Sequence, residues 1–131
     1  MDKVVHFEIP ADDMARAEKF YKDNFGWKIT KVPMPGGEYF LANTVDTDEK
    51  GMPKSPGAIN GGLMKREGTG QTPVIVIKVA SLDNALGKIK RSGGKIVMDK
   101  MNVGNMGLYA RVSDTEGNII GVWEDLPPKQ H

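Results

Sequence analysis

Two kinds of hydrophobic spacing alternate along the first half of the chain. Residues 4–9 form a short β-rich run that ends at Pro10, and residues 13–24 place apolar side chains three and four positions apart. The first pattern is typical of a strand and the second of a helix with one buried face. Strand-like runs follow at residues 27–32, 38–42 and 58–64. The first half therefore predicts the order β-α-β-β-β.

The second half repeats this order. A strand is expected at residues 74–79, and Ser81 precedes a helical pattern that ends at Ser92-Gly93-Gly94. Further strands are expected at residues 95–98, 108–112 and 118–124. Laying His6–Ile9 over Val74–Ile77 aligns both helix starts and both post-helix glycines to within about one residue. The sequence thus predicts a duplicated module.

The length of 131 residues fits one compact domain. We expect a single domain over residues 1–126, with a first module at about 1–65, a second at about 72–126, and a C-terminal tail at 127–131. The longest polar stretch, residues 44–57, lies in the first module and reads as a loop.

Charge and composition exclude several classes of function. Eighteen Lys and Arg against seventeen Asp and Glu leave a net charge of +1, with no basic cluster, so neither nucleic acid nor a membrane surface is an expected partner. The absence of cysteine excludes disulfides, thiolate metal sites and a thiol nucleophile. We recognise no leader peptide and no membrane-spanning segment in the sequence. The expected location is therefore the cytoplasm.

Particular residue runs add a family resemblance that covers nearly the whole chain. The tight turn Asp114-Thr115-Glu116-Gly117-Asn118 is similar to a family hairpin, in which Thr115 replaces the usual proline. The other matching runs are Val5–Asp13, Ala17–Tyr21, Phe25–Trp27, Val79–Ala85 and Asn118–Glu124. Together they resemble glyoxalase/bleomycin-resistance-type domains of the vicinal oxygen chelate superfamily.

The resemblance implies an α+β fold in which two βαβββ modules, related by a pseudo-twofold axis, form a curved mixed sheet. This sheet encloses a cup, and the helices cover its convex side. Because side chains alternate across a strand, Phe7 and Ile9 are expected to pack on a helix while His6 and Glu8 face the cup. A homodimer is expected for two reasons: the sheet has exposed edges, and relatives of the family pair through such edges.

Family enzymes hold a metal at four equivalent strand positions. Carried over by position, these fall on His6 and Glu124, with Val74 and Met64 at the other two. The last pairing follows from superposing Gly61–Met64 on Gly121–Glu124. Zn, Ni, Fe or Mn is the expected kind of metal, but a site needs at least three protein ligands and this chain offers two. The resemblance therefore predicts an incomplete metal site and assigns no certain cofactor.

Further residues are candidates for binding a small molecule in the cup. Arg111 is suited to an anionic group, although a solvated position at a strand edge is an equal alternative. A hydrogen-bonded His6–Glu124 couple that lines a pocket, or acts as an acid–base pair, is an alternative to metal binding. The proposed ligand contacts are Glu8, Met64, Val74, Tyr109, Arg111 and Val122.

Three classes of function follow. The first is a protein that binds a small molecule without catalysis, and the shortage of metal ligands favours it. The second is an enzyme, for which a lyase or isomerase acting by proton transfer fits better than a dioxygenase. The third is a dimeric interaction module with a vestigial cup. Neither catalysis nor the identity of the ligand is fixed by the sequence.

Overall fold

The structure is a computed structural model that describes residues 1–34 and 37–127. The expected tail at 127–131 therefore falls, apart from its first residue, outside the described residues. The chain divides into two compact units. We call His6–Pro73 the N-terminal unit, and the residues from Val74 onward together with Met1–Val5 the C-terminal unit.

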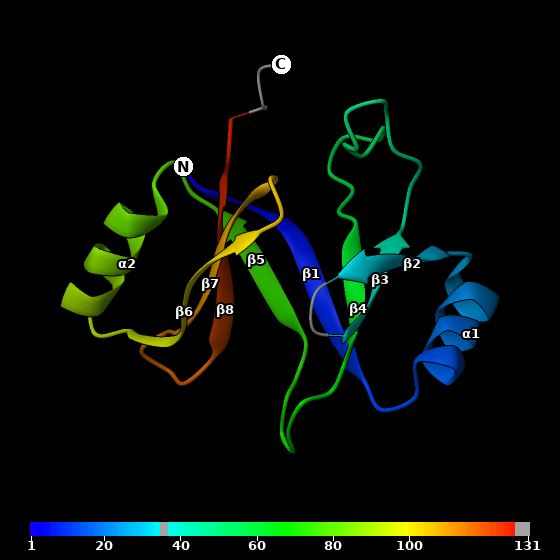
Figure 1. Ribbon diagram of the computed structural model, residues 1–131, viewed down its shortest axis with the longest axis horizontal. Helices are drawn as coiled ribbons and strands as arrows, with labels where there is room; N and C mark the ends of the chain where they lie inside the picture. Colours follow the sequence, from blue (N-terminus) through cyan, green and yellow to red (C-terminus); the bar gives the residue numbers. More distant parts are fainter. Residues whose placement is uncertain (35–36, 128–131) are drawn as a thin grey trace. The chain divides into compact units, whose positions relative to one another are not determined.

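The N-terminal unit has the element order β-α-β-β-β. Its elements are β1 (Lys3–Ala11), α1 (Met14–Phe25), β2 (Lys28–Met34), β3 (Gly37–Asn43) and β4 (Gly61–Lys65), with β1 beginning in the C-terminal unit. The strands lie in the order β2-β3-β4-β1 (Figure 1). Strand β1 runs parallel to β4, and the other two pairs are antiparallel. The parallel pair is possible because the helix and two strands separate β1 from β4 in the sequence.

The C-terminal unit has the same topology. Its elements are β5 (Val74–Lys78), α2 (Leu82–Arg91), β6 (Lys95–Val103), β7 (Gly107–Ser113) and β8 (Ile119–Asp125). The strands lie in the order β6-β7-β8-β5, and β5 runs parallel to β8 (Figure 1). The predicted α+β class is confirmed, and the order of the elements is consistent with the two predicted βαβββ modules. Among the described helices none is long and apolar enough to span a membrane.

Both helices begin at polar capping residues, one of which, Ser81, was indicated by the sequence. The Asp13 side chain accepts a hydrogen bond from the Arg16 backbone N–H, and Ser81 does the same for Asn84. These bonds satisfy N–H groups that have no partner inside the helix. Helix α1 ends at Gly26, which has a φ of 72° and therefore adopts the left-handed conformation that glycine tolerates best.

Each unit has its own core between its helix and one face of its strands. In the N-terminal unit the buried residues are Ala11, Met14, Ala42 and Leu63. Phe7 and Ile9 pack against this cluster, so the predicted orientation of β1 is confirmed. In the C-terminal unit the buried cluster is Leu82, Leu86, Ala110, Val112 and Val122.

Two prolines lie within strands, although Pro10 was expected to end the first strand. Strand β1 continues through Pro10, which pairs in register with Met64, and the next carbonyl accepts a hydrogen bond from the Arg66 backbone N–H. Strand β2 continues through Pro33 to Met34 at the edge of the four strands of its unit. A proline removes only one N–H from a ladder, and an edge strand needs hydrogen bonds on one side only.

Aromatic rings cover the end of α1. Tyr21 stacks on Trp27 with ring centroids 4.8 Å apart, while Phe20 and Phe25 are 53% and 61% exposed.

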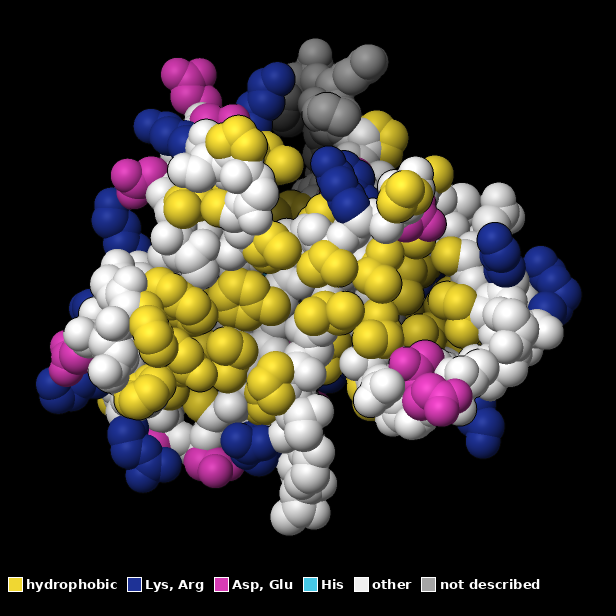
Figure 2. All heavy atoms as spheres, turned by 180° about the vertical axis from the view of Figure 1, so that it is seen from behind, with side chains coloured by type: hydrophobic (Ala, Val, Ile, Leu, Met, Phe, Trp, Pro, Cys, Tyr) yellow, Lys and Arg dark blue, Asp and Glu magenta, His cyan; other side chains and the backbone are white. Residues whose placement is uncertain are grey.

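Figure 2 shows one face of the molecule, on which apolar side chains gather over the elements of the N-terminal unit with charged side chains around them. The homodimer expected from the sequence stays a prediction.

The close contact of β4 with β1 gives a first testable prediction. A Cβ at Gly61 would lie 2.5 Å from the carbonyl oxygen of Phe7 and would also meet its ring. Backbone cannot move aside cheaply, so Gly61→Ala should lower the free energy of unfolding by about 1–3 kcal/mol in a urea titration. Gly68→Ala is the control, because nothing lies within 4 Å of its Cβ position. Equal stability of the two variants would contradict this packing.

Candidate functional site

The strands of the N-terminal unit have one face that packs on α1 and one that is turned away from it, which we call the far face. Phe7, Phe40 and Leu63 lie on the α1 side, one from each of β1, β3 and β4. Since side chains alternate along a strand, their neighbours lie on the opposite side. The far face of this unit therefore carries His6, Glu8, Tyr39, Gly62 and Met64.

His6 is held at this face by two hydrogen bonds. Its Nε2 atom lies 2.9 Å from the hydroxyl oxygen of Tyr39, and the ring also forms a hydrogen bond with the backbone of Asn60. Tyr39 reaches His6 across β4 because Gly62 has no side chain there; a Cβ at Gly62 would collide with the Tyr39 hydroxyl. The missing side chain at Gly62 thus leaves room for a tyrosine ring.

Burial lowers the pKa of His6 below the ordinary value of 6.5. Removal from water disfavours the charged imidazolium, and this effect exceeds two opposing ones. The negative charge of Glu8 and the hydrogen bond to the Asn60 backbone both raise the pKa. His6 is therefore mainly neutral at pH 7, with a ring nitrogen available as a proton acceptor.

Two more polar groups accompany His6. Glu8 is only 7% exposed, two residues further along the same face of β1. The Asn60 side-chain oxygen accepts hydrogen bonds from the backbone N–H groups of Thr44 and Val45, at 2.8 and 3.2 Å. Its amide nitrogen Nδ2 is buried and has no hydrogen-bond partner in the part of the chain that the structure describes. A buried donor in that state is costly unless a water or a ligand meets it.

The C-terminal unit presents a different set of side chains on its own far face. The Arg111 Nε–H donates to the Tyr109 hydroxyl oxygen over 3.1 Å, and the guanidinium carbon lies 5.7 Å from the centre of the Tyr109 ring. Val74 lies on the same face, by alternation from Val76, which a Cβ at Gly121 would meet. This face combines an aromatic ring with a cation, an arrangement suited to anionic or planar ligands.

Two of the predicted site residues lie on the other side of the strands. Val122 belongs to the core beneath α2. The Glu124 carboxylate accepts a hydrogen bond from the backbone N–H of Leu82, the first residue of α2, over 2.6 Å. The expectation that these two side chains share a face with the ligand contacts is wrong. Glu124 instead satisfies a helix N-terminus, where a negative charge is favoured.

A shift of one residue explains the error. The ring of Tyr39 covers Gly62 and the ring of Tyr109 covers Gly121 in the same way. Gly62 is therefore the counterpart of Gly121, whereas the sequence superposition paired Gly121 with Gly61. Because side chains alternate, a slip of one residue moves each side chain to the opposite face. The structural counterpart of Met64 is then Trp123.

Tyr39 and Asn60 were not among the predicted site residues. The signal for Tyr39 was present in the sequence, since Gly37-Glu38-Tyr39 and Gly107-Leu108-Tyr109 begin equivalent strands with the same Gly-x-Tyr pattern. Tyr109 was selected and its repeat partner was not. Asn60 carries no such signal, because a single Asn before a strand is common in loops.

The residues do not fit a divalent metal of the kind that the resemblance implies. Nε2 of His6 is engaged by Tyr39, Val74 and Met64 offer no hard donor atom, and Glu124 points to α2. No group of three or more His, Asp or Glu side chains able to hold a metal occurs within residues 1–34 and 37–127. Three protein ligands are the usual minimum for such an ion.

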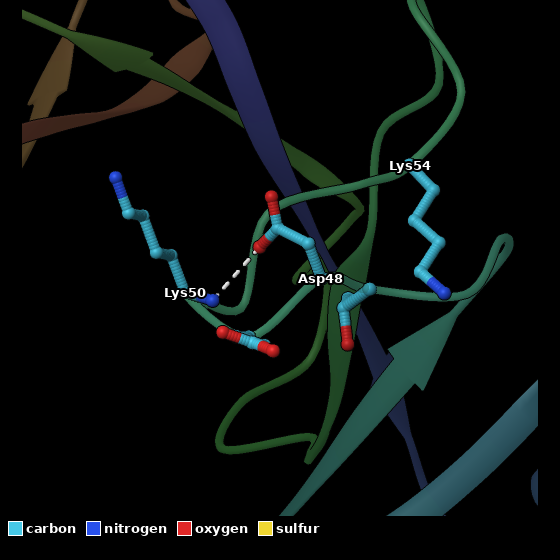
Figure 3. A pocket seen from close by; sticks show the side chains of 5 residues that line it. Asp48, Lys50 and Lys54 are labelled. Carbon is cyan, nitrogen blue, oxygen red and sulfur yellow. Dashed lines mark hydrogen bonds between the residues drawn. The ribbon is translucent and has the colours of Figure 1, made fainter.

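One surface hollow has none of these residues in its lining. It is lined by Thr47, Asp48, Glu49, Lys50 and Lys54 of the loop between β3 and β4 (Figure 3). The Asp48 carboxylate accepts hydrogen bonds from the backbone N–H groups of Lys50 and Met52, both at 2.9 Å. Those bonds shape the turn of the loop, and none of the predicted site residues lines the hollow. We therefore place the candidate site on the far faces of the strands.

Known proteins with similar sequences belong to the class of protein that the repeated βαβββ topology indicates. Residues 3–40 match the model of the bleomycin resistance protein-like N-terminal family. A glyoxylase-like domain-containing protein of Didymella fabae is 32% identical over 120 residues, which are 88% of this chain and 88% of that protein. The chain belongs to the glyoxalase/bleomycin-resistance superfamily.

Two other matches give the limits of the likeness. CFP32 of Mycobacterium tuberculosis, provisionally named a glyoxylase, is 27% identical over 89% of this chain, but the match spans only 43% of CFP32. The crystal structure of methylmalonyl-CoA epimerase from Mycobacterium tuberculosis superposes with a TM-score of 0.67 over 95% of this chain and 88% of that one, at 17% identity. This second likeness concerns the fold alone.

The hydrogen bond between Glu124 and α2 can be tested by substitution. Glu124→Ala removes the acceptor from the Leu82 N–H and should lower the free energy of unfolding by about 1 kcal/mol. Glu67→Ala, at an exposed loop position, is the matched control. Denaturant unfolding with the far-UV circular dichroism signal measures both. If Glu124→Ala is as stable as Glu67→Ala, the carboxylate does not support the helix.

The lowered pKa of His6 predicts a pH dependence of stability. Below pH 6.5 the unfolded chain binds a proton at this residue more readily than the folded chain does, so the free energy of unfolding falls as the pH falls. The fall begins near pH 6.5 and ends below the folded-state pKa of His6. Urea titrations between pH 7.5 and 5 should show this loss, and His6→Gln should reduce it. A wild-type pH dependence that His6→Gln leaves unchanged would contradict the lowered pKa.

Proposed function

We propose that this protein binds a small organic molecule through the far faces of its strands, with His6 as the principal polar anchor and without a metal. The observation that carries the proposal is the part-buried imidazole of His6, which is held by Tyr39 and by the backbone of Asn60. Ligand sites typically combine a mostly apolar lining with a few oriented polar groups. Membership of the glyoxalase/bleomycin-resistance superfamily supports this reading.

Other residues of the proposed site differ in character. Met64 supplies apolar surface on the same face of the strands as the buried residue Glu8. In the C-terminal unit, Val74, Tyr109 and Arg111 are the proposed ligand contacts, with Arg111 for an anionic group. We leave Val122 and Glu124 out of the proposed site because their side chains face α2. The single cup that the resemblance implies stays a prediction.

Proton transfer without a metal is the second candidate function. A neutral imidazole that accepts a hydrogen bond is a competent general base, and burial keeps it neutral at pH 7. An isomerase or lyase needs such a group to remove a proton from its substrate. The fold of methylmalonyl-CoA epimerase is compatible with this candidate, and the substrate of this chain is unassigned.

Ligand-dependent thermal stabilisation tests the main proposal. A screen of small electrophiles, glutathione adducts and aromatic compounds should contain ligands that raise the melting temperature by several degrees, since a ligand at about 100 times its Kd adds about 2.7 kcal/mol. His6→Gln should fold normally and lose most of that shift, because a polar residue of the far face adds little to the core. Addition of EDTA should change nothing.

Two results would contradict the proposal. A tightly bound divalent metal, lost on His6→Gln, would make a metal-dependent enzyme the better conclusion. A screen in which His6→Gln and the wild-type protein respond equally to every ligand would remove His6 from the site. As a control for protein quality, Glu67→Ala should respond to ligands as the wild-type protein does.

A further inference from the structure

Side-chain hydrogen bonds close the loop between β3 and β4 at the point where the strand pairing ends. The last pair of the antiparallel ladder is Ala42 with Gly61. Beyond it, the Asn60 side-chain oxygen accepts hydrogen bonds from the backbone N–H groups of Thr44 and Val45, at 2.8 and 3.2 Å. We call the hydrogen bonds between residues 44–45 and residues 59–60 the stem of the loop. The side chain thus continues the ladder in place of backbone groups.

Beyond the stem, the loop has hydrogen bonds of its own. Thr47 and Pro53 form an antiparallel β-bridge, and the Asp48 backbone N–H donates to the Met52 carbonyl oxygen over 2.8 Å. The Asp48 carboxylate also accepts a hydrogen bond from the Lys50 backbone N–H within the turn (Figure 3). The stem therefore joins a folded body, rather than a plain extended chain, to β3 and β4.

Asn60 contacts His6 as well as the stem. Its backbone forms a hydrogen bond with the ring, and because this bond favours the charged form of the ring, the Asn60 carbonyl is the acceptor. The next residue, Gly61, lies against β1, where a Cβ would be 2.5 Å from the Phe7 carbonyl oxygen. The Asn60 backbone is thus held by β1 on one side and by the stem on the other.

The stem uses only the oxygen of the Asn60 side chain. That oxygen accepts the two backbone hydrogen bonds and lies 3.3 Å from the Thr44 hydroxyl oxygen. The nitrogen Nδ2 is buried and meets no hydrogen-bond partner among residues 1–34 and 37–127. A buried donor in that state costs free energy, so the acceptor is what the side chain contributes at this position. An aspartate would offer the same acceptor.

We propose that Asn60 is a positioning residue that couples the stem of the loop to the His6 ring. With the stem closed, the Asn60 backbone is fixed and its carbonyl stays at the ring. With the stem open, the carbonyl turns away and the ring loses this hydrogen bond. The coupling is reciprocal, so loss of the ring also loosens the stem. This inference rests on the proposed function, since it makes residues 44–60 a control on the orientation of His6, the principal polar anchor of that site.

An ion pair on the surface also joins the loop to β2. Lys28 Nζ lies 2.8 Å from the Asp46 carboxylate, and the two side chains are 73% and 65% exposed. Ion pairs as exposed as this one contribute little to stability, because water screens both charges. Lys28→Ala therefore removes a contact of the loop without touching the stem, and it is the control for the experiments below.

The first experiment measures the stem directly by amide hydrogen exchange. The N–H groups of Thr44 and Val45 are its donors, so their exchange rates report its opening. Asn60→Ala removes the acceptor and should speed the exchange of both amides by about tenfold or more. Asn60→Asp keeps the acceptor and should exchange as the wild-type protein does. Unchanged exchange in Asn60→Ala, or equally fast exchange in Asn60→Asp, would overturn the role of this side chain.

The second experiment tests the coupling with a variant that leaves Asn60 in place. Thr44→Val removes the hydroxyl that donates to the Ile59 carbonyl and should speed the exchange of the Val45 amide by about three- to tenfold. Nitrogen-15 NMR of the His6 ring, assigned by its loss in His6→Gln, should show a changed signal in Thr44→Val for the nitrogen that faces Asn60. Lys28→Ala should show wild-type exchange and a wild-type His6 signal. A faster Val45 amide with an unchanged His6 signal would overturn the coupling.

The reciprocal experiment begins at His6. His6→Phe keeps a ring in β1 but cannot donate a hydrogen bond to the Asn60 carbonyl. We expect the amides of Thr44 and Val45 to exchange about three- to tenfold faster in this variant than in the wild-type protein, since the Asn60 backbone has lost one of its supports. Exchange of both amides at the wild-type rate in His6→Phe would show that the ring and the stem are independent, and the proposal would then be wrong.

The outcomes separate this inference from the proposed function, because none of these measurements uses a ligand. If the stem opens without any effect on His6, the coupling is wrong, and the proposed function still stands when a compound stabilises the wild-type protein and not His6→Gln. If no compound discriminates between those two proteins, the proposed function fails. The exchange rates and the His6 signal then still decide whether Asn60 couples the stem to the ring.

Discussion

The alternation of side chains along a strand is the constraint on which the site depends. In each unit a helix covers one face of four strands, and the residues that bury apolar surface against it occupy every second position. The positions between them do not need apolar side chains. Polar chemistry can therefore accumulate on the far face without weakening the core, and His6 and Glu8 lie there for that reason.

The two units use one packing device for different chemistry. In each, a tyrosine from the strand after the hairpin lies over a glycine of the next strand, Tyr39 over Gly62 and Tyr109 over Gly121. The glycine leaves room for the ring, which in turn protects the exposed backbone. The hydroxyl of Tyr39 then meets a histidine, whereas that of Tyr109 meets Arg111. Duplication preserved the packing, and the hydrogen-bond partners diverged.

Opposing electrostatic effects set the protonation state of His6. Desolvation alone would leave a neutral ring with little capacity to take up a proton, whereas Glu8 and the Asn60 backbone restore part of that capacity. The net effect lowers the pKa of His6, so the ring is mainly neutral at pH 7. The Glu124 carboxylate is turned towards α2 and does not contribute to the pKa of His6. It accepts a hydrogen bond from the first residue of α2 instead.

The sequence by itself determined the duplicated β-α-β-β-β order, the helix cap at Ser81 and the inward face of β1, because these follow from local periodicity and capping chemistry. His6 was a candidate because of the family resemblance. It did not determine the register between the two halves. Gly61 and Gly62 are adjacent and identical, so only cross-strand contacts show that Gly62 matches Gly121. This register places Glu124 on the helix side of its strand and Tyr39 beside His6. A shift of one residue would move each side chain to the opposite face, because side chains alternate along a strand.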